Sequence, residues 1–440
     1  MVVTTGPARR RALVVAICFA VLIFDGFDLI VYGAIVPSLL AYEPWHLTPA
    51  TAGLVGSIAL IGMVVGALSA GGIAAWLGRR RAIIVSMAWF SVAMAVTALM
   101  PTPELFGAVR FLAGVGLGVA IPTCIAVTAD FAPTGRKNLS NAVMFSGYSV
   151  GGIIASLLAI WLLEPLGFRG MFALGALPLV LVVPLAIALL PESPADLLRW
   201  GRIDEAARVA ARYGLTDTPE VAVAADGPAP SLHHGRFLAA TIVFCCAGVF
   251  GQLLTYGMNT WLPQIMKLAG YSLTSSLAFL LAMNLGAIIG SVSTAPLADR
   301  FGVRPVTTCA FGSAMVALIV LSLTSPPPAL LAVLVAIVGF GSIGSLTLLN
   351  GFIAQAYPAR ARAAALSVTF GVARIGGVVA ALGGGGFLAL GLSASWNFAV
   401  WILPALLGAL AALVVPSVHD AVAPTTAPRP REGAASDSPV

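Results

Sequence analysis

The sequence predicts an all-α membrane protein with twelve transmembrane helices arranged in two pseudo-symmetric six-helix halves. Hydrophobic residues make up 59% of the chain and charged residues only 9%, whereas soluble domains carry about 25% charged residues. A mean hydropathy of +1.01 over 440 residues is too high for one soluble core, so much of the apolar surface must face lipid. A similar loop also follows the second and the eighth expected helix, which indicates a repeated half.

The individual helices are predicted from the apolar runs, because about 20 apolar residues cross a hydrocarbon core about 30 Å thick. In the first half these runs are 12–40, 50–75, 81–100, 104–130, 138–163 and 170–190. In the second half they are 237–262, 273–298, 305–324, 328–355, 361–388 and 393–416. We therefore expect four regions, namely an N-terminal half, a cytoplasmic linker, a C-terminal half and a disordered cytoplasmic tail, over 1–190, 191–236, 237–416 and 417–440.

The basic residues predict the orientation in the membrane. The loops on one side hold nearly all of the 23 Lys and Arg residues, including the triplets 9–11 and 79–81, and the other side holds only Arg169 and Lys267. Basic loops stay in the cytoplasm, so we expect a monomer in the inner membrane with both termini cytoplasmic. The same asymmetry explains the net charge of +6 without a nucleic-acid partner.

The cysteines and other reactive side chains predict neither a metal site nor an enzyme. None of the cysteines has a metal-binding or redox spacing, and all lie in apolar runs, at Cys18, Cys124, Cys245, Cys246 and Cys309. No nucleophile and base form a recognisable set. We therefore expect no cofactor and no catalytic residue.

Two aspartates in the first expected helix are the first candidate site. Asp25 and Asp28 are three residues apart, which puts them on one helix face. Charges within a membrane span are costly, so they indicate a functional site. Burial disfavours the charged carboxylate and a nearby cation favours it, so a carboxyl that alternates between these settings can bind and release a proton. The alternative is a pair of structural carboxyls bonded to hydroxyls or to the backbone.

Two arginines lie within expected spans. Arg374 is about a dozen residues into the eleventh span, which puts it roughly 18 Å deep. Its planar guanidinium suits a substrate carboxylate, although a permanent salt bridge to Asp25 or Asp28 is the alternative. Arg110 lies about 9 Å inside the fourth span, where it could bind substrate or extend to the membrane interface. The Gly-x-Gly-x-Gly at 114–118 indicates close helix packing rather than a nucleotide loop.

Other polar and aromatic residues in the spans either bind substrate or bridge helices, and the sequence leaves both open. These further candidates are Tyr148, Gln252, Tyr256, Asn259, Trp261, Asn284, Asn350 and Gln355.

Several motifs together resemble those of the major facilitator superfamily over nearly the full length. Residues 71–80 resemble its Gly-x-x-x-Asp-Arg-x-Gly-Arg-Arg loop, residues 110–114 its Arg-x-x-x-Gly motif and residues 191–194 its usual exit from helix six. Within the superfamily, Asp25-Gly26-Phe27-Asp28 resembles the Asp-Gly-x-Asp motif of the aromatic acid:proton symporters. The segments 259–263, 350–358 and 374–376 also resemble that family.

This resemblance implies the major facilitator fold and proton-coupled import of a small aromatic carboxylate. The substrates of such symporters are benzoate, hydroxybenzoates, protocatechuate or gentisate, so the expected partners are an aromatic acid, protons and the lipid bilayer. Proton-driven export of drugs or aromatic compounds by the same fold is the alternative. A membrane receptor or an embedded enzyme has no supporting motif.

The first loop departs from the superfamily pattern. Ala75 and Trp76 stand where the signature has aspartate and arginine, whereas Asp299 and Arg300 are intact in the second copy. The resemblance implies a gating role for this region, which also includes Arg79 and Arg80. Because the aspartate helps to latch the cytoplasmic gate in the superfamily, we expect this chain to spend more time open to the cytoplasm.

Overall fold

The computed structural model describes residues 6–133, 137–215, 235–357 and 359–415, and these ranges are helical almost throughout. Eleven helices within them are long and apolar enough to cross a membrane. The elements of the first half are α1 (Pro7–Leu40), η1 (Glu43–Trp45), α2 (Pro49–Leu77), α3 (Arg79–Leu99), α4 (Pro103–Phe131), α5 (Lys137–Leu174), η2 (Leu177–Leu179) and α6 (Val182–Leu189).

Two short helices, α7 (Pro194–Arg199) and α8 (Ile203–Tyr213), follow the first half. The second half consists of α10 (Gly235–Leu268), α11 (Leu273–Phe301), α12 (Val303–Leu323), α13 (Pro328–Ala356), α14 (Ala359–Ala389), α15 (Ala394–Ala399) and α16 (Ile402–Val414). The expected tail at 417–440 and much of the expected linker lie outside the described residues.

The sixth expected span, 170–190, is broken rather than continuous. Its first part continues α5 beyond a kink at Gly167, where φ is 64°. The remainder forms η2 and α6, which return along α3 and α1. Pro178 lies at the start of η2, and a proline lacks the N–H that a continuous helix needs. The sixth span therefore consists of several short helical segments, which explains why the described helices provide eleven full-length spans instead of twelve.

The two halves repeat the same helix packing. In the first half α1 packs on α5 and α2 on α4; in the second half α10 packs on α14 and α11 on α13. The turns between α2 and α3 and between α11 and α12 also share one conformation. Gly78 has φ 82° and ψ 154°, and Gly302 has φ 89° and ψ 147°. Only glycine adopts this region without strain, so the repeated loop of the sequence has a repeated structural purpose.

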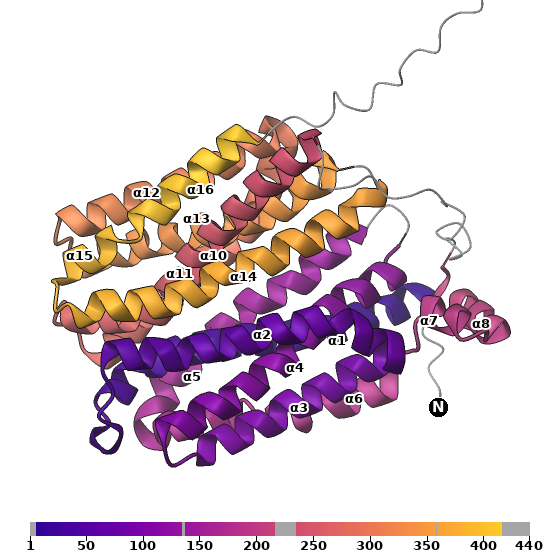
Figure 1. Cartoon of the computed structure of the whole chain (residues 1–440), viewed down its shortest axis with the longest axis horizontal. Coiled ribbons are helices and arrows are strands. Elements are labelled where there is room, and N and C mark those ends of the chain that lie inside the picture. Colours follow the sequence, from indigo (N-terminus) through magenta and orange to yellow (C-terminus); the bar gives the residue numbers. More distant parts are fainter. Residues whose placement is uncertain (1–5, 134–136, 216–234, 358, 416–440) are drawn as a thin grey trace, which may run out of the picture.

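The halves lie against each other along their length, with the indigo-to-magenta helices on one side and the red-to-yellow helices on the other (Figure 1). The contacts between the halves join α2 to α14, α5 to α11 and α1 to α10. We call the end where α1 begins and α7 and α8 lie the terminal end, and the opposite end, at the loop 41–48, the distal end (Figure 1). The three contacts enclose the middle of the bundle.

Glycines bring the halves into backbone contact towards the distal end. A Cβ on Gly33 of α1 would overlap the carbonyl oxygen of Asn259 on α10, and one on Gly53 of α2 would meet the carbonyl oxygen of Ala381 on α14. Small residues allow this approach between membrane helices. We call these two contacts the distal seam.

The distal seam can be tested by enlarging Gly33. Gly33→Val must separate α1 from α10, so we expect a cysteine placed at the buried Leu60 to react severalfold faster with a maleimide in purified protein lacking its native cysteines. Gly312→Val on α12 is the matched control, because an added Cβ there meets nothing within 4 Å. Equal labelling rates in both variants and the parent would contradict the seam.

Candidate functional site

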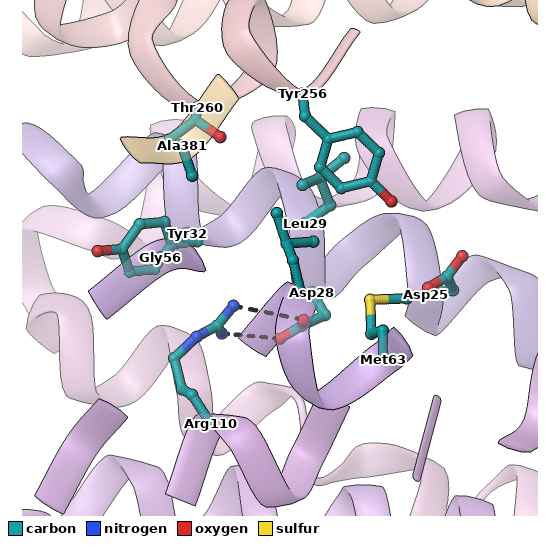
Figure 2. A pocket seen from close by; sticks show the side chains of 11 residues that line it. Asp25, Asp28, Leu29, Tyr32, Gly56, Met63, Arg110, Tyr256, Thr260 and Ala381 are labelled. Carbon is teal, nitrogen blue, oxygen red and sulfur yellow. Dashed lines mark hydrogen bonds and ion pairs between the residues drawn. The ribbon is translucent and has the colours of Figure 1, made fainter. Parts of the chain in front are cut away.

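A narrow pocket lies between the halves at mid-length of the bundle. Five helices contribute to it, and Figure 2 shows the side chains around it. The pocket is lined by Asp25, Asp28, Leu29 and Tyr32 of α1, Gly56, Leu60 and Met63 of α2, Arg110 of α4, Tyr256 and Thr260 of α10, and Ala381 of α14.

Arg110 and Asp28 form a buried ion pair in this pocket. The guanidinium donates hydrogen bonds of 2.9 and 3.4 Å to the two carboxylate oxygens (Figure 2). Both side chains are at most 5% exposed, and the guanidinium also lies 4.9 Å from the ring centre of Tyr32 and 5.2 Å from that of Phe172. Arg110 therefore does not extend to the membrane interface, and its direct role towards a substrate stays a prediction.

Asp25 lies in a different environment from Asp28, although both belong to α1. It is buried, lies on the far side of Asp28 from Arg110 (Figure 2), and has no ion pair or hydrogen bond among the described residues. Its strongest electrostatic attraction is to Arg374. Of the two carboxyls predicted to share one helix face, Asp28 is thus paired with Arg110 and Asp25 is unpaired among the described residues.

The glycine between the two aspartates also has a structural reason. A Cβ on Gly26 would overlap the backbone carbonyl oxygen of Tyr148, so only glycine lets α1 approach α5 this closely. The contact places the Tyr148 side chain near that of Tyr256. The Tyr148 hydroxyl is buried and has no hydrogen-bond partner of good geometry among the described residues.

Arg374 reaches the site from α14 without pairing to an acid. Its Nη1 donates to the Tyr256 hydroxyl at 2.8 Å and lies 3.7 Å from the Met63 sulfur. No salt bridge joins it to a carboxylate among the described residues, so the alternative of a permanent ion pair is not found there. A guanidinium has five N–H donors, and most of those on Arg374 therefore stay available to an anion.

The other candidates divide into several groups. Asn259 lies outside the pocket lining and bonds Asn284. Trp261 donates to the Ala380 carbonyl at 3.3 Å and packs beside the glycines of α14, so it braces two helices. Gln252 makes no hydrogen bond within the described part of the chain. The side chains of Asn350 and Gln355 lie outside the described residues.

Sequence reasoning missed the apolar wall of the pocket, which includes Leu60 and Met63 of α2 and Ala381 of α14. An apolar residue in an apolar helix gives no local signal. The contact between α2 and α14, which brings these residues together, was also not predicted from the sequence.

Comparison with known proteins identifies the family. The sequence profile of the Major Facilitator Superfamily matches residues 18–381 and, a second time, residues 280–437. The chain belongs to this superfamily. Its members are transporters, so the protein is not an enzyme, and the predicted fold class is confirmed.

Two transporters and one solved structure are similar to this chain over most of their length. A gentisate transporter of Corynebacterium glutamicum is 38% identical over 93% of this chain and 88% of the relative. A benzoate transport protein of Acinetobacter baylyi is 34% identical over 91% of this chain and 89% of the relative. A partially occluded, inward-open structure of the xylose transporter XylE from E. coli has a TM-score of 0.74 at 19% identity, covers 92% and 99% of the two chains, and supports the fold alone.

The signature loop of the superfamily forms a charged cluster at the terminal end. Arg79 pairs with Asp130, and its backbone N–H donates to Asp196 at 2.7 Å. Arg80 lies 3.5 Å from Glu192. These partners come from α4 and from the segment around α7, so the cluster ties the start of α3 to its own half.

At position 75, where the superfamily signature has an aspartate, this chain has Ala75, and the end of α2 makes a different contact. Arg199 of α7 donates to the carbonyl oxygens of Ala74 and Ala75 at 3.2 and 2.8 Å, which satisfies carbonyls that a helix end leaves free. In the second copy Asp299 and Arg300 are both exposed. A latch between the halves at this end, and the bias that we expect from Ala75, stay predictions.

The different environments of the two aspartates predict opposite effects on stability. Asp28→Asn leaves Arg110 buried without its counter-charge, and breaking a buried pair costs about 3–5 kcal/mol. We therefore expect a clearly lower unfolding temperature for the purified protein. Asp25→Asn is the matched control and should unfold at or above the parent temperature, since its carboxylate has no hydrogen bond or ion pair to lose among the described residues. Equal losses in the two variants would contradict the assignment.

Proposed function

We propose that this transporter imports a small aromatic carboxylate, together with protons, across the bacterial inner membrane. The observation that carries the proposal is Arg374, a guanidinium at mid-bundle whose described partners are a phenol and a thioether, near the unpaired carboxyl of Asp25. The relatives named as a gentisate transporter and a benzoate transport protein support the substrate class.

Arg374 is the proposed carboxylate ligand. Its fork can donate two parallel hydrogen bonds to one carboxylate, and Tyr256 already holds it in position through a 2.8 Å hydrogen bond. Aromatic side chains that can stack on the planar ring of a substrate lie near Arg374. Tyr148 and Tyr256 lie beside Arg374, and one turn nearer the terminal end the rings of Phe145 and Phe370 stack across the two halves at 6.3 Å.

Asp25 is the proposed proton carrier, and its attraction to Arg374 supplies the coupling. While Arg374 is free, its positive charge favours the ionised carboxylate of Asp25. A substrate carboxylate on Arg374 neutralises that charge, which favours protonation of Asp25. Linkage is reciprocal, so protonation of Asp25 also strengthens substrate binding. Asp28 is held by Arg110 in the present arrangement, and a coupling role for it would require that pair to open.

The proposed orientation places the terminal end, and therefore both chain termini, in the cytoplasm. The basic loops gather at this end, which carries Arg79–Arg81 and the arginines of α7 and α8. Such loops remain cytoplasmic in membrane proteins. Accumulation of the acid inside cells or right-side-out vesicles distinguishes import from proton-driven export.

The role of Arg374 is tested by a conservative substitution. Arg374→Lys replaces a fork by a point charge, so we expect KM for uptake of a radiolabelled aromatic acid to rise roughly tenfold or more. Arg169→Lys is the matched control, because Arg169 lies at the distal end, where it donates to the carbonyls of Ala98 and Met100 and lies over the rings of Trp45 and Phe168. The amide of the acid should not compete with uptake by the parent, and equal competition by acid and amide would refute the carboxylate site.

The coupling role of Asp25 is tested by removing its proton site. We expect Asp25→Asn to abolish accumulation driven by a pH gradient in proteoliposomes while exchange of labelled for unlabelled acid continues, because exchange need not release the proton. Asp204→Asn on the exposed start of α8 is the control and should accumulate substrate as the parent does. Full gradient-driven uptake by Asp25→Asn would exclude Asp25 as the carrier.

A further inference from the structure

A pair of buried asparagines lies beside the site, outside the pocket lining. Asn259 of α10 and Asn284 of α11 are both 0% exposed. Asn284 donates its Nδ2 to the Leu280 carbonyl at 2.9 Å and, more weakly, to the Asn259 Oδ1 at 3.4 Å. The Asn284 Oδ1 has no hydrogen-bond donor among the described residues. The pair is therefore incomplete on one side.

The orientation of both amides follows from their neighbours. Asn284 Nδ2 faces the Leu280 carbonyl, and Asn259 Nδ2 faces the Thr255 carbonyl at 2.8 Å. Exchanging N and O in either amide would place two acceptor oxygens together, so the assignment holds. The pair thus presents two acceptor oxygens, one without a donor and one with a single long hydrogen bond. A buried acceptor left unpaired is costly, and native proteins rarely keep one without a reason.

The free acceptor faces the helix that also carries Tyr148. A Cβ on Gly152 of α5 would overlap the Asn284 Oδ1, so α5 passes directly beside this oxygen. Tyr148 lies four residues earlier on the same face of α5, and its hydroxyl is buried and lacks a partner of good geometry. At 1.5 Å per residue the two positions are about 6 Å apart along the helix.

A similar spacing of about one helical turn occurs on α10. Tyr256, which receives the hydrogen bond from Arg374, lies three residues before Asn259 and therefore on nearly the same helix face. The asparagine pair is thus about one helical turn, or 5.4 Å, nearer the distal end than the group of Arg374 and the two tyrosines. This separation is on the scale of a single benzene ring.

We propose that Asn259 and Asn284 form a hydroxyl-recognition subsite, so that the transporter selects aromatic acids that carry a ring hydroxyl. The inference rests on the proposed function: Arg374 holds the carboxylate, the ring lies between, and the hydroxyl donates to the free Asn284 oxygen. A phenolic O–H supplies the one donor that the Asn284 oxygen lacks among the described residues. An unsubstituted ring or a methoxy group has no such donor and leaves the acceptor unpaired, which is how polar sites reject analogues.

The parent protein tests the selectivity directly. The probes are 3-hydroxybenzoate, 4-hydroxybenzoate and 2,5-dihydroxybenzoate, each compared with its methyl ether and with benzoate as competitors of uptake. We expect at least one hydroxylated acid to bind about tenfold or more tightly than both its ether and benzoate. Equal inhibition by hydroxylated, methoxylated and unsubstituted acids would overturn the subsite while leaving the proposed function intact. A parent that takes up no aromatic acid would overturn both.

Variants at Asn284 assign the selectivity to this residue. Asn284→Leu keeps a similar volume without the acceptor, so we expect affinity for the preferred hydroxylated acid to fall to the benzoate level while benzoate uptake persists. Thr294→Val is the control, because Thr294 is also buried on α11, with a hydroxyl that has no hydrogen-bond partner among the described residues, but lies ten residues nearer the terminal end. It should keep the parent preference.

The same measurement separates recognition from a purely structural role. An equal loss of affinity for benzoate and for the hydroxylated acid in Asn284→Leu would overturn the proposal, and so would an unchanged preference. If Asn284→Leu does not reach the membrane, Asn284→Ala, which also lacks the acceptor but adds no bulk, provides the same ratio of affinities.

Discussion

Asp28 and Arg110 hold each other in the interior of the N-terminal half, where neither charge is stable alone. Their two hydrogen bonds and the aromatic faces of Tyr32 and Phe172 offset the loss of hydration that burial imposes. Because Arg110 pairs with Asp28, the other two charged groups of the site, Asp25 and Arg374, have no ion pair among the described residues. This single interaction makes the site asymmetric, because it leaves one ion pair beside two charged groups that are not paired with each other.

The backbone contacts between helices decide how near these charges come to one another. Gly26 allows α1 to lie on α5 beside Tyr148, and Gly33 allows it to lie on α10 beside Asn259. Helix α1 thus carries both aspartates and also forms one of the three contacts between the two halves. A movement of the halves that opens the distal seam would therefore change the surroundings of Asp25, as the proposed coupling of proton binding to access requires.

The two copies of the signature loop have diverged in chemistry while keeping one backbone shape. Gly78 and Gly302 adopt nearly the same conformation, yet among the described residues only the first copy is surrounded by ion pairs from α4 and α7. Arg199 bonds the end of α2 where the superfamily signature has an aspartate at position 75. The linker helix α7 therefore stabilises this end of the N-terminal half. The donor, Arg199, lies outside both copies of the signature motif.

The sequence by itself determined the fold class, the approximate positions of the spans and the identity of the charges within them. These properties depend on local hydropathy, on charge and on the length that crosses a bilayer, and all three are written along the chain. The broken sixth span was the exception, because Gly167 and Pro178 act on helix continuity more than on hydropathy.

Only the tertiary structure decided which side chains pair: Arg110 with Asp28 and Arg374 with Tyr256, while an Asn284 oxygen has no donor in the described part of the chain. Pairing depends on the rotation of each helix about its axis and on which helices touch. Those are set by packing between residues far apart in the chain, 82 positions for Asp28 and Arg110 and 118 for Tyr256 and Arg374, which no local pattern records.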